Sequence, residues 1–130
     1  MGNWRDAGSS AVAVAKRDTL REEARFRILR LLADNPELSQ REIATAVGIS
    51  SGATHYLLHA LVEKGHVKLS NFQASPDKRR YAYILTPRGL AAKAELTRKF
   101  LARKKAEFEA LKAEIETLET DVAASEAGEG

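Results

Sequence analysis

Residues 39–65 read SQREIATAVGISSGATHYLLHALVEKG. Ser39 and Glu42 have the spacing of a capping box, in which side chain and backbone each satisfy an unpaired donor at a helix start. Gly48 supplies the positive φ that a helix end usually needs. Ser50 is the expected cap of the next helix. The stretch therefore predicts two short helices joined by a tight glycine-containing turn.

The flanking residues predict one helix before this stretch and a hairpin after it. Apolar residues recur at three- and four-residue steps from about 19 to 34. Pro36 ends that helix, because the residue before a proline is pushed away from helical angles. Residues 66–70 and 80–86 alternate like strands around a polar tip of nine residues. The pattern predicts a β-hairpin with a long tip.

A long helix is predicted from about 90 to 120, with Thr86 and Pro87 as its cap and first residue. Its apolar residues repeat as a heptad seam. Thirty residues span about 45 Å at about 1.5 Å each, which is too long to bury against so small a domain. We expect the seam to pair with the same helix of a second chain. The residues assigned to this dimerisation are Leu90, Ala94, Leu101, Phe108, Leu111, Ile115 and Leu118.

The predicted fold class is mainly α with a small β-hairpin (α+β). The order of elements predicts a winged helix-turn-helix head followed by a long C-terminal dimerisation helix. We expect a flexible arm over 1–17, the head over 18–89, the long helix over 90–120 and a disordered tail over 121–130.

Over about residues 20–90 the chain resembles the MarR family of winged helix-turn-helix regulators. LSQREIA at 38–44 with VGIS at 47–50 is similar to the second helix and turn of that family. DKRR at 77–80 resembles its wing signature, and LTPRG at 85–89 resembles its exit into the next helix. The resemblance implies a homodimeric transcriptional regulator that binds a near-palindromic operator in double-stranded DNA.

More narrowly, the chain is similar to small MarR-type regulators associated with bacterial exopolysaccharide (EPS) gene clusters. The similar pieces are NPELSQRE at 35–42, NF at 71–72, YAY at 81–83 and LTP at 85–87. The resemblance implies exopolysaccharide genes as the target. Larger MarR proteins carry further helices at both ends, which build the dimer and often a ligand pocket. Here a single C-terminal helix must do the pairing.

The helix after Ser50 is predicted to enter the major groove, where the N-terminal half of a recognition helix reaches base edges. Its predicted core face is Ala53, Leu57, Ala60 and Leu61. The outward face then holds Ser51, Gly52, His55, Tyr56 and His59. The resemblance places the base-reading positions on Ser51, Gly52, Thr54, His55 and Tyr56, and we count Ser50 at the helix start with them.

Two further segments are predicted to touch the DNA backbone. The preceding helix opens with Ser39, Gln40 and Arg41, and amides at a helix start bind phosphate. Simple capping is the alternative for this segment. The wing carries Lys78, Arg79 and Arg80, which suit a minor groove or a phosphate. A solvated hairpin is the alternative there.

The charge distribution separates a basic front from an acidic end. Residues 1–90 carry fourteen Lys or Arg against nine Asp or Glu, and residues 91–105 carry six against one. Residues 106–130 carry one against eight. A basic front favours a polyanionic partner. Antiparallel pairing of two long helices would place unlike charges side by side, so we favour it over parallel pairing.

Several function classes are disfavoured. The chain has no cysteine, which removes disulfides and thiolate metal sites. His55 and His59 have a metal-binding spacing, with His66 near in sequence, but no carboxylate or cysteine completes a set, so we predict no metal and no cofactor. Motifs of hydrolases and phosphate loops are absent, and we predict that the chain is not an enzyme. Without a membrane-length apolar run or a signal-peptide pattern, we expect a cytoplasmic protein with no membrane partner.

Two other functions stay open on the sequence. A protein-interaction module would need apolar residues on the outward face of the recognition helix, where Leu58 is the one candidate. A sensor switched by a small-molecule effector would need a pocket between head and long helix. Such a pocket would be lined by residues such as Phe72, Tyr83 and Phe100.

Overall fold

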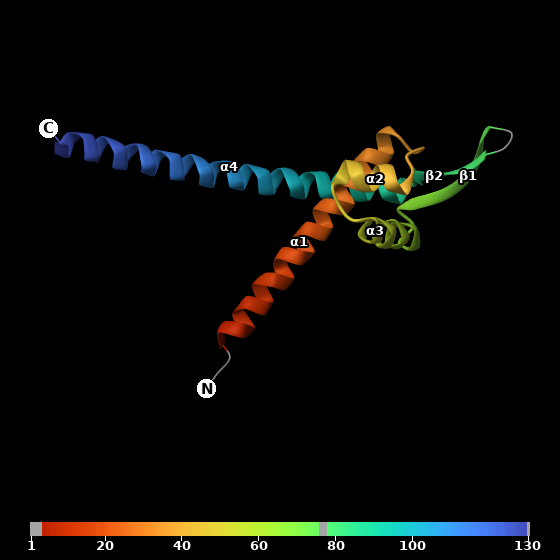
Figure 1. Cartoon of the computed structure of the whole chain (residues 1–130), viewed down its shortest axis with the longest axis horizontal. Helices are drawn as coiled ribbons and strands as arrows, with labels where there is room; N and C mark the ends of the chain where they lie inside the picture. The colour runs from red at the N-terminus through yellow and green to blue at the C-terminus, as the bar shows by residue number, and fades with distance from the viewer. Residues whose placement is uncertain (1–3, 76–77, 130) are drawn as a thin grey trace. The chain divides into compact units, whose positions relative to one another are not determined.

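The computed structural model describes residues 4–75 and 78–129, and their side chains over 12–71 and 81–128. The elements follow one another as helix, helix, helix, hairpin and helix (Figure 1). This order confirms the predicted fold class. The elements are α1 (Trp4–Asp34), α2 (Gln40–Val47), α3 (Ser51–Glu63), β1 (Val67–Ser75), β2 (Lys78–Leu85) and α4 (Pro87–Glu129).

The chain forms two compact units, Met1–Leu96 and Thr97–Gly130. The boundary lies inside α4 rather than between residues 89 and 90. The first turns of α4 therefore belong with the helices and the hairpin of the first unit, against whose core Ala92 and Leu96 pack.

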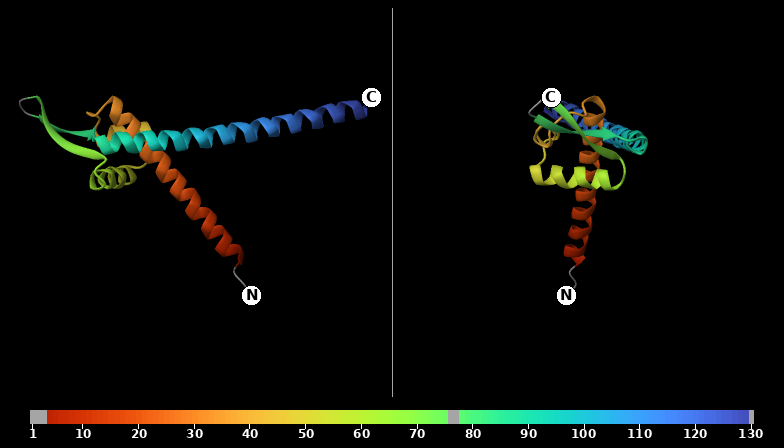
Figure 2. Two further views of the ribbon diagram at one scale, coloured as in Figure 1. Left: turned by 180° about the vertical axis from the view of Figure 1, so that it is seen from behind. Right: turned by 90° about the vertical axis from the view of Figure 1, so that its right-hand side faces the viewer.

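The core of the first unit lies where α1, α2, α3 and the start of β1 meet. Burying an aliphatic side chain of this kind contributes about 1.5–3 kcal/mol, so this cluster fixes α2 and α3 relative to each other. Its most deeply buried aliphatic side chains are Ile28, Leu29, Leu32, Ile43, Leu61 and Val67. The hairpin extends away from these helices in Figure 1 and in the left view of Figure 2.

The predicted caps of α2 are confirmed. The Ser39 hydroxyl accepts from the Glu42 N–H at 3.1 Å, and the Glu42 carboxylate accepts from the Ser39 N–H at 3.2 Å. Gly48 ends α2 with a φ of 79°. Only glycine adopts this left-handed conformation at little cost, so the turn between the two helices is fixed by local chemistry.

Both long helices extend beyond their predicted ends. α1 begins at Trp4 and not near residue 19, so the described part of the predicted arm is helical. α4 continues to Glu129 and not to about residue 120, so residues 121–129 of the predicted tail are also helical. Both extensions are rich in alanine, which has the highest helix propensity. Val12 and Val14 are at least half-exposed on α1, which explains why this segment shows no apolar period.

The hairpin is longer than predicted. β1 and β2 pair antiparallel from Val67 with Leu85 to Ser75 with Lys78, with an irregularity between Gln73 and Ser75. The predicted nine-residue tip is therefore wrong. Strand pairing uses backbone hydrogen bonds, so polar residues continue the ladder without any apolar alternation to reveal it.

Hydrogen bonds from Thr86 link the start of α4 to Gly65 and His66, which follow α3. The Thr86 hydroxyl accepts from the Gly89 N–H at 3.0 Å and donates to the Gly65 carbonyl, while the Thr86 N–H donates to the His66 carbonyl at 3.1 Å. These contacts confirm Thr86 as the cap and Pro87 as the first residue of α4. A Cβ added to Gly89 would lie 1.9 Å from the His66 carbonyl oxygen, so this close approach requires glycine.

Among the described residues, no helix combines the length and the apolar character that a membrane span needs.

Candidate nucleic-acid interface

Helix α3 has one buried face and one exposed face. The buried residues are Thr54, Leu57, Leu58 and Leu61. All five residues that the sequence placed outward are exposed; we call them the α3 face, and they are Ser51, Gly52, His55, Tyr56 and His59. The predicted core face was partly wrong, because Ala53 is exposed and Ala60 is only half-buried.

Thr54 is not available to DNA. Its side chain has no exposed surface, and its hydroxyl donates to the Ser50 carbonyl at 2.9 Å. This hydrogen bond satisfies the polar group one turn back on the helix, which lets threonine occupy a core position. The prediction that Thr54 reads a base is therefore wrong.

Leu58 lies in the core and not on the α3 face. It is 3% exposed and belongs to the cluster with Leu57 and Leu61. The apolar residue that a protein-interaction module would present on α3 is therefore absent from the described part of that face.

The N-terminal end of α3 is open. Ser50 caps the helix by accepting from the Ala53 N–H at 3.1 Å. A Cβ added to Gly52 would meet no atom within 4 Å. Another molecule can therefore approach the backbone closely at this point.

Tyr56 borders a hollow that it shares with residues of α1. Its side chain is 62% exposed. It lines a hollow of about 280 Å³ whose other residues include Asp18, Arg21 and Arg25 of α1. Tyr56 therefore lies at the edge of the α3 face that borders these α1 arginines.

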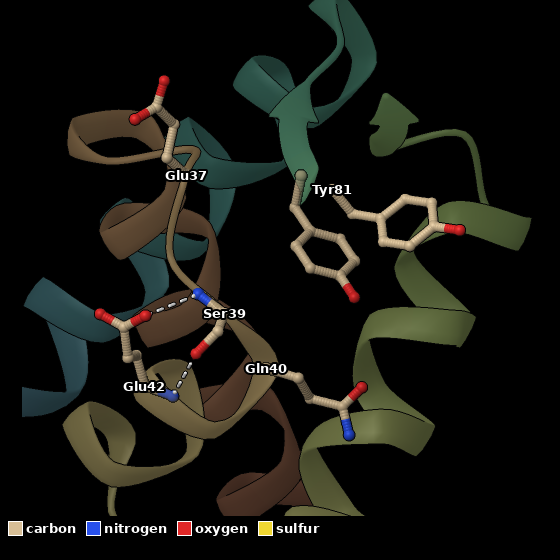
Figure 3. A pocket seen from close by; sticks show the side chains of 6 residues that line it. Glu37, Ser39, Gln40, Glu42 and Tyr81 are labelled. Carbon is tan, nitrogen blue, oxygen red and sulfur yellow. Dashed lines mark hydrogen bonds between the residues drawn. The ribbon is translucent and has the colours of Figure 1, made fainter. Parts of the chain in front are cut away.

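The start of α2 is joined to α3 by Gln40. The Gln40 amide nitrogen donates to the Ser51 carbonyl at 3.4 Å, and its amide oxygen lies 3.3 Å from Nδ1 of His55. Figure 3 shows the Gln40 side chain pointing from α2 toward α3. Sequence reasoning assigned Gln40 to a phosphate and missed this link. Arg41, beside it, is exposed.

A hollow of about 420 Å³ lies between the start of α2 and strand β2. Its lining residues are Glu37, Ser39, Gln40, Glu42, Tyr81 and Tyr83. In Figure 3 the Tyr81 hydroxyl points toward Ser39 and Gln40, whereas the carboxylates of Glu37 and Glu42 point away. Burial, and then the neighbouring Tyr81, raises the pKa of Tyr83, so this hydroxyl keeps its proton and can donate.

Sequence reasoning did not assign Tyr81 and Tyr83 to an interface with DNA. Their alternate spacing on β2 was the available signal, since residues i and i+2 share one face of a strand. Tyr83 also lines a smaller hollow of about 140 Å³ with Gln40, His55 and His59. Of the residues expected to line an effector pocket, Tyr83 lines the two hollows just described. Phe72 has its side chain outside the described residues, and Phe100 belongs to the second unit.

The predicted wing residues are only partly described. The backbone of Lys78, Arg79 and Arg80 forms the first part of β2. Their side chains lie outside the described residues. Their contact with DNA stays a prediction.

The histidines do not form a metal centre in the described part of the chain, where no group of three or more candidate ligands occurs. The His55 and His59 rings are stacked, with centroids 6.4 Å apart and planes 14° apart. His59 Nε2 lies 3.2 Å from a carboxylate oxygen of Glu63. His66 stands apart from them, and its pKa is lowered by burial and then by Lys64, Arg88 and Arg25.

The residues assigned to dimerisation form an exposed apolar seam on α4. All seven are exposed in the single chain. In the second unit the exposed fractions run from 46% at Ile115 to 62% at Phe108. Val122 continues the seam by one heptad and is 56% exposed.

Residues 21–68 match a protein family described as winged helix-turn-helix DNA-binding. The match begins in α1, covers α2 and α3, and ends in β1. This part of the chain is therefore similar to winged helix-turn-helix DNA-binding domains. No curated protein matches the chain significantly.

Solved transcriptional regulators have a similar fold. One from Clostridium thermocellum is 21% identical, covering 68% of this chain and 90% of that one, with a TM-score of 0.59. A MarR/EmrR family regulator from Acinetobacter sp. ADP1 is 20% identical, covering 94% and 98%, with a TM-score of 0.54. The transcriptional repressor CouR, solved with a 23-mer DNA duplex, is 28% identical, covering 76% and 70%, with a TM-score of 0.54.

Proposed function

We propose that the chain is a sequence-specific transcriptional regulator that binds double-stranded DNA as a homodimer. Helix α3 enters the major groove with the α3 face toward the bases. The wing formed by β1 and β2 lies in an adjacent minor groove. The family match over α2 and α3 and the likeness to a repressor solved on DNA support this proposal.

The observation that carries the proposal is the α3 face itself. Ser51, His55 and His59 present hydroxyl and imidazole groups, and Gly52 leaves the helix backbone open to close approach. Hydrogen bonds to base edges need groups of this kind at the N-terminal half of a helix. Leu58, which a protein partner would need on this face, is buried instead.

Contacts to the phosphate backbone flank this face. The backbone N–H groups of Gln40 and Arg41 lie in the first turn of α2, where no preceding turn of the helix offers a carbonyl to accept from them. Helix starts of this kind bind phosphate. The Tyr81 hydroxyl faces the same end of α2 (Figure 3). We assign the larger hollow to this phosphate contact.

The exposed seam of α4 supports pairing with a second copy of the chain. A homodimer has two-fold symmetry, so two copies of α3 would read two half-sites of a near-palindromic operator. The resemblance of residues 35–42 and 81–87 to regulators of exopolysaccharide clusters supports exopolysaccharide genes as the target.

The test is selection of bound fragments from a genomic DNA library, followed by a salt titration on each enriched site. We expect a short inverted repeat, with an affinity that falls steeply as salt rises, since each phosphate contact releases counterions. Arg79→Ala should reduce the salt slope by about one unit. Lys112→Ala, which removes the same charge from the acidic part of α4, should leave the slope unchanged.

The absence of any enriched site, with only weak and salt-sensitive binding, would contradict the proposal. Enrichment of sites without an inverted repeat would contradict the dimeric part of it. Sites that lie away from exopolysaccharide genes would contradict the assigned target and leave DNA binding intact.

A further inference from the structure

We propose that Gln40 fixes the hydrogen-bonding role of His55, so that α3 prefers an amino base over a keto base where His55 faces the DNA. The amino bases are adenine and cytosine, and the keto bases are guanine and thymine. This inference rests on the proposed function, because it concerns which base that function selects.

The orientation of the Gln40 amide follows from its two contacts. One end lies 3.4 Å from the Ser51 carbonyl oxygen, and the other lies 3.3 Å from Nδ1 of His55. A carbonyl oxygen can only accept, so the NH2 group must face Ser51. The amide oxygen must then face His55, because the flipped amide would place two acceptors against each other.

The orientation of the amide decides where His55 carries its hydrogen. The Gln40 oxygen can only accept, so Nδ1 of His55 must donate to it. A neutral imidazole carries a hydrogen on one nitrogen only. Nε2 of His55 is therefore bare and acts as an acceptor. Without Gln40, nothing in these contacts would select this tautomer.

The His55 ring is also held from its other side. The His59 ring stacks on it with planes 14° apart, and Nε2 of His59 in turn lies 3.2 Å from a carboxylate oxygen of Glu63. The side chain of His55 is exposed. The titratable groups that share its small hollow are His59 and Tyr83. The ring is therefore positioned on the α3 face and accessible to a base.

An acceptor on this face distinguishes bases by their major-groove edges. Adenine presents the N6 amino group and cytosine the N4 amino group, both of which donate. Guanine presents N7 and O6, and thymine presents O4, all of which accept. An acceptor facing an acceptor leaves both groups unpaired. We expect a preference of about tenfold for an amino base at one position of each half-site, within the range for a good base contact.

The tautomer can be measured without DNA. In the full chain labelled with ¹⁵N at pH 8, long-range ¹H–¹⁵N spectra resolve the two ring nitrogens of each histidine, and the chain has only three. We expect His55 to carry its hydrogen on Nδ1 in the wild type. In Gln40→Ala the hydrogen should move largely to Nε2. A His55 protonated on Nε2 in the wild type, or the same spectrum in both proteins, would overturn the inference.

The base preference is measured by selection from an operator randomised at each position. Gln40→Ala should reduce the amino-base preference from about tenfold to below about twofold at one position per half-site. In Gln40→Glu the carboxylate also accepts from Nδ1 and favours a second proton on the ring, so Nε2 becomes a donor and guanine should gain. Arg41→Ala, at the neighbouring position, should weaken binding to all bases alike.

A purely structural role of Gln40 would lower the affinity for every sequence and leave the preference unchanged, which would contradict the inference alone. Failure of every protein, wild type included, to select DNA would instead overturn the proposed function, and the base preference with it. The spectra would still decide the tautomer in that case.

Discussion

Gly52 is the residue of α3 at which steric access matters most. A side chain added there meets no atom of the protein within 4 Å, so Gly52→Leu should leave the fold intact. Helix propensity favours leucine over glycine by about 0.5–1 kcal/mol, so the thermal midpoint should hold or rise slightly. Affinity for the selected operator should fall about tenfold or more, equal to about 1.4 kcal/mol, because the new side chain occupies the space into which DNA approaches.

The matched control for this substitution is Gly128→Leu. Gly128 is also helical, with no atom within 4 Å of an added Cβ, but it lies near the end of α4. It should change neither the fold nor the affinity. Equal affinities of Gly52→Leu and the wild type would show that this part of α3 does not approach DNA.

His66 should make the stability of the first unit depend on pH. Burial, and then Lys64, Arg88 and Arg25, lowers its pKa in the folded chain below the usual value of 6.5. Below about pH 6.5 the unfolded chain then binds this proton more readily than the folded chain does. The stabilising contribution is therefore present above about pH 6.5 and is lost as the pH falls through the lowered pKa. Urea unfolding at a series of pH values between 5 and 8 measures it.

The comparison for this prediction is His66→Gln, which should show a smaller loss of stability toward low pH. Arg88→Gln should also reduce the loss, because it removes one of the charges that disfavour the protonated ring. If the free energy of unfolding of His66→Gln depended on pH as it does in the wild type, other groups would cause the loss of stability at low pH.

The burial of Thr54 explains why the core face of α3 predicted from the sequence is rotated slightly from the observed one. A pattern search counts threonine as polar and alanine as apolar, which favours Ala53 and Ala60 over Thr54 and Leu58. The hydrogen bond from Thr54 to the Ser50 carbonyl removes the cost of burying its hydroxyl. The five residues of the α3 face were still predicted correctly as exposed, because the chemistry of capping had fixed where the helix begins.

At the scale of elements, close packing constrains the start of α4 at Gly89. In Gly89→Ala the new Cβ would lie 1.9 Å from the His66 carbonyl oxygen, so the backbone must shift. We expect a loss of about 1–3 kcal/mol, the usual cost of overpacking. The thermal midpoint should then fall by roughly 4–8 °C for each kcal/mol in a domain of this size, as measured by circular dichroism.

Gly128→Ala is the control for Gly89→Ala, because alanine there is helical and unobstructed. A midpoint unchanged in Gly89→Ala would mean that the approach of α4 to His66 is not close in solution.

Caps were predictable at the scale of elements, whereas helix and strand ends without caps were not. The helix caps at Ser39, Gly48 and Thr86 form hydrogen bonds with residues only three or four positions away, so the local sequence is enough to predict them. The extra turns of α1 and the outer part of the hairpin have no such marker. Alanine propensity and backbone pairing extend them, and neither leaves an apolar period in the sequence.

For the whole molecule, the exposed seam of α4 predicts that the oligomeric state depends on single apolar residues. Leu111 is 55% exposed in the single chain and lies at the middle of the seam. Leu111→Asp should convert the dimer to a monomer in sedimentation, because it places a charge at a core position of the paired helices. Affinity for the inverted repeat should fall as well, since a monomer engages one half-site at a time.

Ala110→Asp adds the same charge one residue away from the seam and should leave the dimer intact. The first unit should stay folded in both variants, because its core is formed by α1, α2, α3 and β1. A dimeric Leu111→Asp would place the contact between chains elsewhere on the molecule.

We expect charge to set the arrangement of two paired α4 helices. Residues 91–105 of α4 are basic and residues 106–130 are acidic, so antiparallel helices place unlike charges together and parallel helices place like charges together. The chain has no cysteine, which allows a clean test with Ala94→Cys and Val122→Cys, near the two ends of the seam. In an antiparallel pair, a mixture of the two variants should form a disulfide between them, and neither should cross-link to itself. In a parallel pair each would cross-link to itself, while the unlike positions would be about 42 Å apart along the helix.

Ready self-cross-linking of Ala94→Cys would contradict the antiparallel arrangement. Weakening of the dimer by salt would further support it, since exposed charge pairs are screened.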